Sequence, residues 1–187
     1  GETFKYTIDS FINELKDNDV KNFVNDSMIQ IKYMSKTLSD FRNFLKPSTK
    51  KVLFSISKAL NEINEIIGKQ VFYSNINMNF NYKNKNEELL IYGYENEFKQ
   101  VLLNIINNAK NKIVEKNLPL NKKGEININI QRCENCNMIE IIDDAGAIDE
   151  KIINSIFEPY FTTKENGMGL GLYMAKTIIE KNMNGTI

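Results

Sequence analysis

The sequence predicts an α/β fold of the α+β type, a two-layer α/β sandwich preceded by an antiparallel helical hairpin. Three patterns predict it: apolar residues at alternating steps of four and three near the start, later segments with period-two alternation, and one long apolar stripe at helical period. The 187 residues, 42% of them hydrophobic, suffice for one compact domain and a smaller helical part. We expect a helical unit over 1–49 and the sandwich over 50–187.

The helical unit is predicted as two helices joined by the polar residues 16–19 and ended by Pro47. A hairpin of this kind cannot bury its apolar seam alone, so we expect a homodimer in which two hairpins form a four-helix bundle. The alternative is that the hairpin folds back on its own sandwich. The seam consists of Phe4, Ile8, Phe11, Leu15, Val20, Val24, Ser27, Ile31, Met34, Leu38, Phe41 and Leu45.

The second half of the chain alternates predicted helices and strands. Helices on one face of a mainly antiparallel sheet make a two-layer sandwich. The longest predicted helix has an apolar stripe of Phe98, Val101, Leu102, Ile105, Ile106, Ala109 and Ile113. In chain order we expect a helix at 54–70, strands at 75–82 and 87–94, the long helix at 95–115, strands at 125–130 and 138–143, a short helix near 148–157 and a last helix at 170–183.

Composition excludes several classes of partner. Lys and Arg total 24 and Asp and Glu total 24, so no positive surplus exists to bind a nucleic acid or an anionic membrane. No apolar run approaches the roughly 18 residues that a membrane span requires, and the start has no signal-peptide pattern. We therefore expect no nucleic acid, no membrane contact by this part of the protein, and a cytoplasmic location.

The two cysteines, Cys133 and Cys136, have C-x-x-C spacing. A structural zinc site needs four ligands, and with no histidine and no other cysteine the chain cannot complete one. Because the pair falls between two predicted strands, we interpret it as a hairpin turn, with a redox pair as the alternative. The absence of a disulfide framework fits a reducing compartment.

The long helix also carries a row of amides, with Asn104, Asn108 and Asn111 at i, i+4 and i+7. Amide oxygens can bind a hard cation, and amide N–H groups can bind phosphate oxygens. A solvated polar face is the alternative in so Asn-rich a chain.

Two further clusters follow the hairpin strands. Asp143 and Asp144 come directly after a hydrophobic strand, where a carboxylate can accept from an exocyclic amine; a plain turn is the alternative. Farther on, three glycines alternate just before the last helix, where backbone N–H groups can converge on phosphate oxygens; a flexible loop is the alternative. This second cluster comprises Thr162, Thr163, Lys164, Gly167, Gly169 and Gly171.

Together the clusters resemble the motifs of a known family. NIINNA at 104–109, DDAGA at 143–147, FEPYFTTK at 157–164 and GMGLGL at 167–172 resemble the N, G1, F and G2 boxes of bacterial sensor histidine kinases of two-component systems. These belong to the wider fold of gyrase, heat-shock-90, histidine-kinase and mismatch-repair ATPases, and the resemblance covers about residues 50–187. The preceding hairpin looks like the second half of the family's dimerisation and phosphotransfer domain.

The resemblance implies that ATP and Mg²⁺ are the cofactors. Asn104 and Asn108 would hold the magnesium that bridges the phosphates, Asp143 would accept from the adenine amino group, and the glycines would form a lid. The γ-phosphoryl group would pass to a histidine and then to a response regulator; no residue of this chain is assigned as catalytic. The implied nucleotide-binding set is Asn104, Asn108, Asn111, Asp143, Gly146, Ile148, Thr163, Lys164, Gly167, Gly169, Leu170, Gly171 and Leu172.

The sequence departs from the family pattern at several points. The chain has no histidine, so the acceptor is absent, and we expect truncation upstream rather than evolutionary loss. In the family, further strands follow a segment like 182–187, so we expect truncation at this end as well. The resemblance also allows the full-length protein to be anchored in the inner membrane. Asp144, Ala145 and Ala147 replace an Asn and two glycines of the G1 box, and Met168 stands where Thr is common.

These departures leave two functions open. If Ala145 and Ala147 occupy positions of positive φ, they add strain, and ATP binding is weak. The chain would then be a degenerate kinase that serves as a dimerisation or partner-binding module; otherwise it is an active kinase core. An ATP-driven clamp is disfavoured, because the hairpin is of kinase type. We also expect residues 163–169 to be mobile without nucleotide.

Overall fold

A computed structural model describes residues 22–23, 26–28, 31, 48–84, 87–116, 118–119, 122–164 and 167–187. The chain divides into two units, Gly1–Asn43 and Phe44–Ile187. In the first unit, the described residues 22–23, 26–28 and 31 are helical. The rest of the predicted hairpin and most of its seam lie outside the described residues, so the hairpin and its dimer remain predictions.

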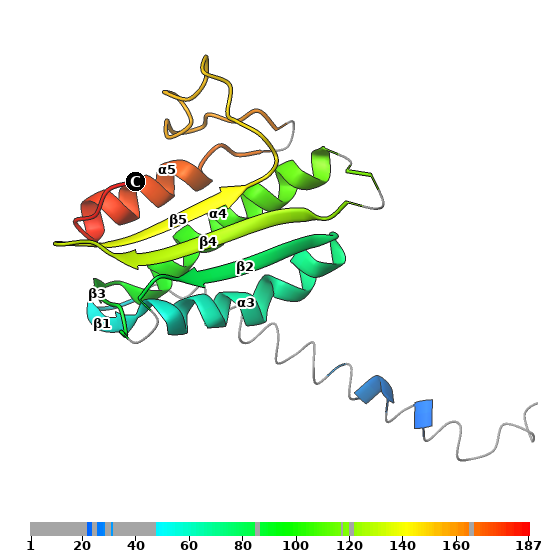
Figure 1. Cartoon of the computed structure of the whole chain (residues 1–187), viewed down its shortest axis with the longest axis horizontal. Coiled ribbons are helices and arrows are strands. Elements are labelled where there is room, and N and C mark those ends of the chain that lie inside the picture. The colour runs from blue at the N-terminus through cyan, green and yellow to red at the C-terminus, as the bar shows by residue number, and fades with distance from the viewer. Residues whose placement is uncertain are drawn as a thin grey trace, which may run out of the picture. The chain divides into compact units, whose positions relative to one another are not determined.

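The second unit contains five strands and three α-helices among its described residues, followed by a π-helix (Figure 1). None of the helices that the structure describes is long and apolar enough to cross a membrane. In chain order the elements are β1 (Val52–Ser55), α3 (Ile56–Tyr73), β2 (Ile76–Tyr82), β3 (Leu90–Gly93), α4 (Glu95–Glu115), β4 (Gly124–Arg132), β5 (Asn137–Asp143), α5 (Gly171–Lys176) and the π-helix η1 (Thr177–Asn182).

The main sheet has the strand order β2-β4-β5. β2 pairs with β4 in parallel, and β4 pairs with β5 antiparallel. Alternate residues of β4 are buried, and Ile126, Ile128 and Ile130 join one core cluster with residues of α3 and α4. The sheet therefore has one face covered by helices, and α4 passes behind β4 in Figure 1. The predicted two-layer α/β sandwich is confirmed. The expectation of a mainly antiparallel sheet was wrong for the main sheet, which is mixed because α4 connects β2 to β4 as a crossover.

The uncovered face of the sheet is lined with amides. Asn77 and Asn79 of β2 both donate to the carboxylate of Glu125, and Asn81 donates to Asn129 over 3.0 Å. These bonds link the parallel strands side chain to side chain, and they account for the alternation of Asn with Ile, Met and Phe along β2.

Helix α3 begins at Ile56, directly after Ser55, whose Oγ accepts from the backbone N–H of Lys58 over 3.4 Å. This is a side-chain cap of the kind that stabilises a helix N-terminus. The residues before it form β1, which pairs with β3 in a separate two-stranded ribbon. The prediction of a helix from residue 54 was therefore wrong at its start. The short run VLFS carries no period-two alternation long enough to distinguish a strand from a first helical turn.

Helix α4 begins after Tyr94, which makes no side-chain cap bond. Ser48, a residue far away in the sequence, supplies the cap instead. Its Oγ accepts from the N–H of Asn96 over 3.2 Å, and its own N–H donates to Oε1 of Glu97 over 3.1 Å. The reciprocal pair is a capping box made between two distant segments.

Two predicted helices differ in the structure. Residues 150–157 form successive turns. A single four-residue bond, from the N–H of Ile153 to the carbonyl of Asp149, is followed by three-residue bonds such as Ser155 N–H to the carbonyl of Ile152. The last predicted helix is divided into α5 and the π-helix η1. Met183, the residue that follows η1, donates its N–H five residues back to the carbonyl of Ile178. Apolar spacing does not distinguish α from π winding over one or two turns.

Candidate nucleotide-binding site

The predicted amide row lies on α4 as expected. Asn104 and Asn108, one turn apart, are half-buried, whereas Asn111 is exposed. The buried stripe of the same helix, which includes Ile106, Ala109 and Ile113, packs on the core, so the amides flank the packed face. The helix thus presents two polar side chains beside the sheet on a rigid element.

The segment around the glycines reaches this amide row at two points. The amine of Lys164 donates to Oδ1 of Asn108 over 3.1 Å. The amide of Asn104 donates to the backbone carbonyl of Gly171 over 3.5 Å, and a Cβ on Gly171 would lie 3.7 Å from the carboxamide carbon of Asn104. Two of the predicted clusters therefore meet on one side of α4.

The charge of Lys164 also acts on the end of α4. The pKa of Glu115 is lowered, mainly by the hydrogen bond from Lys112, and to a smaller extent by the charge on Lys164. The charge of Lys164 thus favours the ionised form of Glu115, the last residue of α4. A cation held at this position is suited to meet a phosphate group.

Asp143 is the last residue of β5 and pairs with the fully buried Ile126. Because directly paired residues share a face of the sheet, the Asp143 side chain lies on the helix-covered face, where it is half-buried. Its Oδ1 accepts from the backbone N–H of Ala145 over 2.9 Å. No hydrogen bond to Oδ2 is made within the described residues, so one carboxylate oxygen is available to accept from an amino group.

Asp144 has a structural role. Its Oδ1 accepts from the N–H of Glu125, which extends the pairing of β4 with β5 by one residue. Its carbonyl accepts from the amine of Lys116 over 2.9 Å. Sequence reasoning missed Lys116, although it continues the apolar row of Ala109 and Ile113 on α4 and is thereby aimed at the sheet.

The two alanines of the G1 box do not strain the backbone. Positive φ in this loop is found at Gly146, with φ of 101°, and neither Ala145 nor Ala147 has positive φ. Ala145 packs against the main core cluster. The expected strain at the alanines was therefore wrong, because glycine is kept at the loop position that requires it.

Gly169 is the glycine whose identity the structure requires most. Its φ is 65°, and an added Cβ would lie 2.6 Å from the carbonyl oxygen of Phe161 and still closer to the carbonyl group of Tyr160. Thr162, named with this cluster in the sequence, contacts both of its neighbours there: its Oγ1 accepts from the N–H of Lys164 and fills the space beside Gly167.

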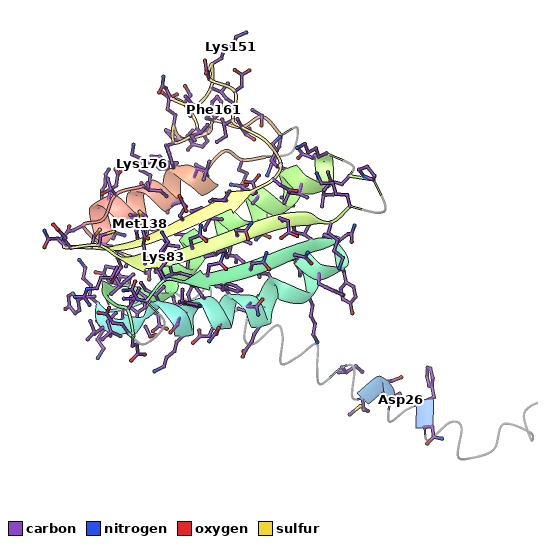
Figure 2. All side chains as sticks on the ribbon, viewed as in Figure 1. Asp26, Lys83, Met138, Lys151, Phe161 and Lys176 are labelled. Atoms are coloured by element: carbon purple, nitrogen blue, oxygen red, sulfur yellow. The ribbon has the colours of Figure 1, made fainter. Side chains whose placement is uncertain are left out.

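The intervening segment stands off the sandwich. Figure 1 shows residues 144–164, yellow to orange, rising away from the sheet and α5, and Figure 2 shows Lys151 and Phe161 on this segment and Lys176 on α5. Hydrogen bonds of Asp144 and Lys164 hold its two ends to the sandwich, and between them the amine of Lys176 lies 5.3 Å from the ring centre of Phe157. Residues 165–166 of the predicted mobile stretch lie outside the described residues, and its mobility remains a prediction.

The remaining predicted residues differ in their exposure. Gly146, Ile148 and Thr163 are exposed, and Leu170 and Leu172 are half-buried. A cavity of about 490 Å³ lies elsewhere, between α3 and β2, and none of the predicted site residues lines it. The candidate site lies beside α4, apart from this cavity.

The donor set fits a magnesium ion carried by a nucleotide. Among the described residues there is no group of three or more His, Cys, Asp and Glu side chains that could hold a metal. Mg²⁺ typically binds one or two protein oxygens and completes its shell with water and phosphate oxygens. Oδ1 of Asn108 already accepts from the Lys164 ammonium, which shows that a cation can reach it.

Comparison with known proteins places the chain in a family. Residues 93–187 match the profile described as "Histidine kinase-, DNA gyrase B-, and HSP90-like ATPase". The chain belongs to this family. The match includes α4, the end of β5 and the glycine segment, so the candidate site lies within the ATPase family's matched region.

Sequence relatives identify the branch of the ATPase family. Sporulation kinase A of Bacillus subtilis (strain 168) is 31% identical over 152 residues, which cover 80% of this chain and 23% of that protein. Sensor protein kinase PilS of Pseudomonas aeruginosa is 30% identical over 88 residues, covering 46% of this chain and 16% of that protein. The predicted resemblance to the ATP-binding domain of a sensor histidine kinase is confirmed, and the chain spans less than a third of either relative.

Solved structures agree on the fold. The nucleotide-free catalytic domain of histidine kinase ThkA is 26% identical, with a TM-score of 0.60 and coverage of 72% of this chain and 82% of that one. A longer ThkA structure, in complex with response regulator protein TrrA, has a TM-score of 0.57 at 22% identity and covers 96% of this chain and 51% of that one. The ATPase fold is therefore shared across most of the described second unit.

Proposed function

We propose that this chain is the ATP-binding kinase core of a sensor histidine kinase. It binds Mg-ATP on the surface beside α4, and the γ-phosphoryl group passes to a histidine that these 187 residues do not contain. One arrangement carries the proposal: Lys164 donates to Asn108, and Asn104 donates to Gly171. Both bonds lie beside the sheet face on which Oδ2 of Asp143 accepts no hydrogen bond from a described residue.

Each group has a role in nucleotide binding. Oδ2 of Asp143 accepts from the exocyclic amine of adenine, which distinguishes adenine from guanine because guanine presents a carbonyl oxygen at that position. Asn104 and Asn108 supply neutral oxygens to the magnesium ion, and Lys164 neutralises phosphate charge. The chain's contribution to phosphoryl transfer is positioning and charge neutralisation.

Partners follow from the same proposal. ThkA, whose catalytic domain resembles this chain, has been solved in complex with response regulator protein TrrA. We propose a response regulator as the final phosphate acceptor here, and a homodimer through the helical unit at the start of the chain. The degenerate-kinase alternative is not proposed, since the strain that suggested it is absent at Ala145 and Ala147.

The test is calorimetric titration with Mg-ATP and Mg-GTP. Asp143→Asn replaces an acceptor oxygen and removes the charge, and the loss of a charge-assisted hydrogen bond should weaken ATP binding by roughly ten- to a hundredfold. Asp149→Asn, an exposed acid on the same loop, is the matched control and should bind ATP as the parent does. Equal binding of ATP and GTP by the parent chain would refute the assignment of Asp143.

A second experiment tests the kinase activity itself. A longer form of the protein that includes the acceptor histidine is incubated with γ-labelled ATP, and acid-labile phosphate is measured with and without Asn108→Ala. We expect label on the parent protein and little on the variant. Equal label on the parent protein and the variant would show that phosphotransfer does not depend on Asn108, and it would contradict the proposed site.

A further inference from the structure

The hairpin that joins β4 to β5 holds the two cysteines opposite each other. β4 ends at Arg132 and β5 begins at Asn137, and these two residues are paired. One position further, the backbone N–H of Cys133 donates to the carbonyl of Cys136 over 2.8 Å. The predicted hairpin turn is thus confirmed, and the strand pairing itself brings the two cysteines together.

The thiol of Cys136 also influences that of Cys133. A side-chain hydrogen bond with Cys136 raises the pKa of the Cys133 thiol, and burial raises it further. The pair is unequal in access, because Cys136 is exposed and Cys133 is half-buried. Within the described residues no metal-binding group of three or more ligands includes them, and the proposed nucleotide site does not use them.

The tip of the hairpin is fastened to its surroundings. The N–H of Arg132 donates to Oδ1 of Asn84 over 3.0 Å, and its guanidinium forms an ion pair with Glu87. On the other strand, the amide of Asn137 donates to the carbonyl of Leu90 over 2.9 Å. Met138, labelled in Figure 2, follows on the same strand. Both flanking strands are therefore held, and the cysteines stay in register.

We propose that Cys133 and Cys136 form a reversible dithiol–disulfide pair that exchanges with low-molecular-weight disulfides. Two thiols fixed side by side on an exposed turn form an internal disulfide faster than either can keep a small adduct. The pair adjoins the first residue of β5, whereas Asp143 is the last, so the proposal is independent of nucleotide binding.

The exchange has two steps. The Cys136 thiol loses its proton to solvent, and its sulfur attacks one sulfur of the small disulfide, so that a mixed disulfide forms and one small thiolate leaves. Cys133 then loses its proton and attacks the Cys136 sulfur, which forms the internal disulfide and releases the second thiolate. Two protein thiols are oxidised, and one small disulfide is reduced to two thiols.

The test treats the 187-residue chain with oxidised glutathione, alkylates the remaining thiols under denaturing conditions, and measures intact mass. We expect the parent chain to lose two hydrogens, to keep no glutathione and to take up no alkyl group; dithiothreitol should restore two alkylatable thiols. A parent chain that keeps glutathione, that still has both thiols free, or that forms disulfide-linked dimers would overturn the proposal. This measurement uses the parent chain alone, so it does not depend on whether a variant folds.

Single variants test the order of attack. Cys133→Ser should keep one glutathione on Cys136, and Cys136→Ser should acquire its adduct on Cys133 several-fold more slowly, because the half-buried thiol reacts less readily. The variant with both cysteines changed to serine is the control and should remain unmodified. Faster capture by Cys136→Ser than by Cys133→Ser would overturn the assignment of Cys136 as the attacking thiol.

Discussion

The amine of Lys164 lies 3.1 Å from Oδ1 of Asn108, although the two residues are 56 positions apart in the sequence. The bond places a positive charge on the amide oxygen that we assign to the magnesium ion. Binding of Mg-ATP must therefore exchange one cation for another at Asn108 and turn Lys164 toward the phosphates. The cost of breaking this bond is small when a phosphate group offers the ammonium a stronger acceptor.

Replacing Lys164 with Met should weaken Mg-ATP binding by about tenfold or more, since a charge-assisted hydrogen bond to phosphate is lost. The salt dependence of binding should become shallower, because one fewer charge pair is screened. Titration at two ionic strengths checks both effects. Lys151→Met, an exposed lysine on the same segment, should leave both unchanged. A Lys164→Met variant with the parent's salt dependence would contradict the role of the charge.

Gly169→Ala should reduce ATP binding while the sandwich stays folded. The left-handed backbone at this residue alone costs an Ala about 1–2 kcal/mol, and the added Cβ meets the carbonyl groups of Tyr160 and Phe161. The segment must rearrange, but it stands off the core, so the thermal midpoint should change little. Met168→Ala, at a side chain that is 80% exposed, is the control for loop composition. Unchanged ATP binding by Gly169→Ala would show that the glycine segment is not part of the site.

The Gly146→Ala variant should measure backbone strain alone, because the added Cβ would overlap no neighbouring atom. This glycine has a φ of 101°, and its nearest neighbour to an added Cβ is the amine of Lys116 at 3.9 Å. We expect a loss of about 1 kcal/mol or more in the free energy of unfolding, because the side chain disfavours positive φ. Chemical denaturation measures it, and an Ala145→Gly variant, at a residue without positive φ, should bring no relief of strain.

Ser48→Ala should lower the free energy of unfolding by about 1 kcal/mol, because α4 loses its only side-chain cap among the described residues. Thr49→Ala changes the exposed neighbour and should cost much less. A double-mutant cycle with Glu97→Gln, read by urea denaturation, should show coupling between the two halves of the capping box. Additive effects would mean that the two hydrogen bonds act separately.

Lys116→Met should weaken ATP binding several-fold through the position of the Asp143 loop, since the variant loses the bond to the carbonyl of Asp144. Because Lys116 is exposed and methionine is similar in length, stability should change little. Lys112→Met, a surface lysine on the same helix, is the matched comparison. Equal ATP binding by the two variants would exclude a positioning role for Lys116.

Long amphipathic elements could be predicted from the sequence. The helix at 95–115 and the strands of the β4–β5 hairpin have many apolar residues at a single period, and each was found within about two residues of its expected bounds. Short elements could not. β1 has four residues, and η1 differs from an α-helix only in its hydrogen-bond partners. The conformation of each of these two elements depends on tertiary contacts, which local sequence patterns do not predict.

The sequence could predict the types of residue in the site and their elements, but not the contacts between them. Spacing placed Asn104 and Asn108 on one side of a helix, and the strand pattern placed Asp143 at the end of a strand. The bond between Lys164 and Asn108 crosses many intervening residues, so no local pattern encodes it. The φ angles of the G1 loop also escaped prediction, because the choice of which residue turns left-handed depends on how the loop meets the sheet.

The parallel pairing of β2 with β4 has a consequence for how the molecule opens. Paired residues of these strands are 48 positions apart, and α4 lies in the connection between them. The strands can join only after that long connection has closed, an entropic cost that the packing of α4 helps to offset. Amide hydrogens of β2, α4 and β4 should then exchange with solvent together, at the free energy of global unfolding. The residues of α4 that we assign to the ligand therefore belong to the part of the protein that unfolds last.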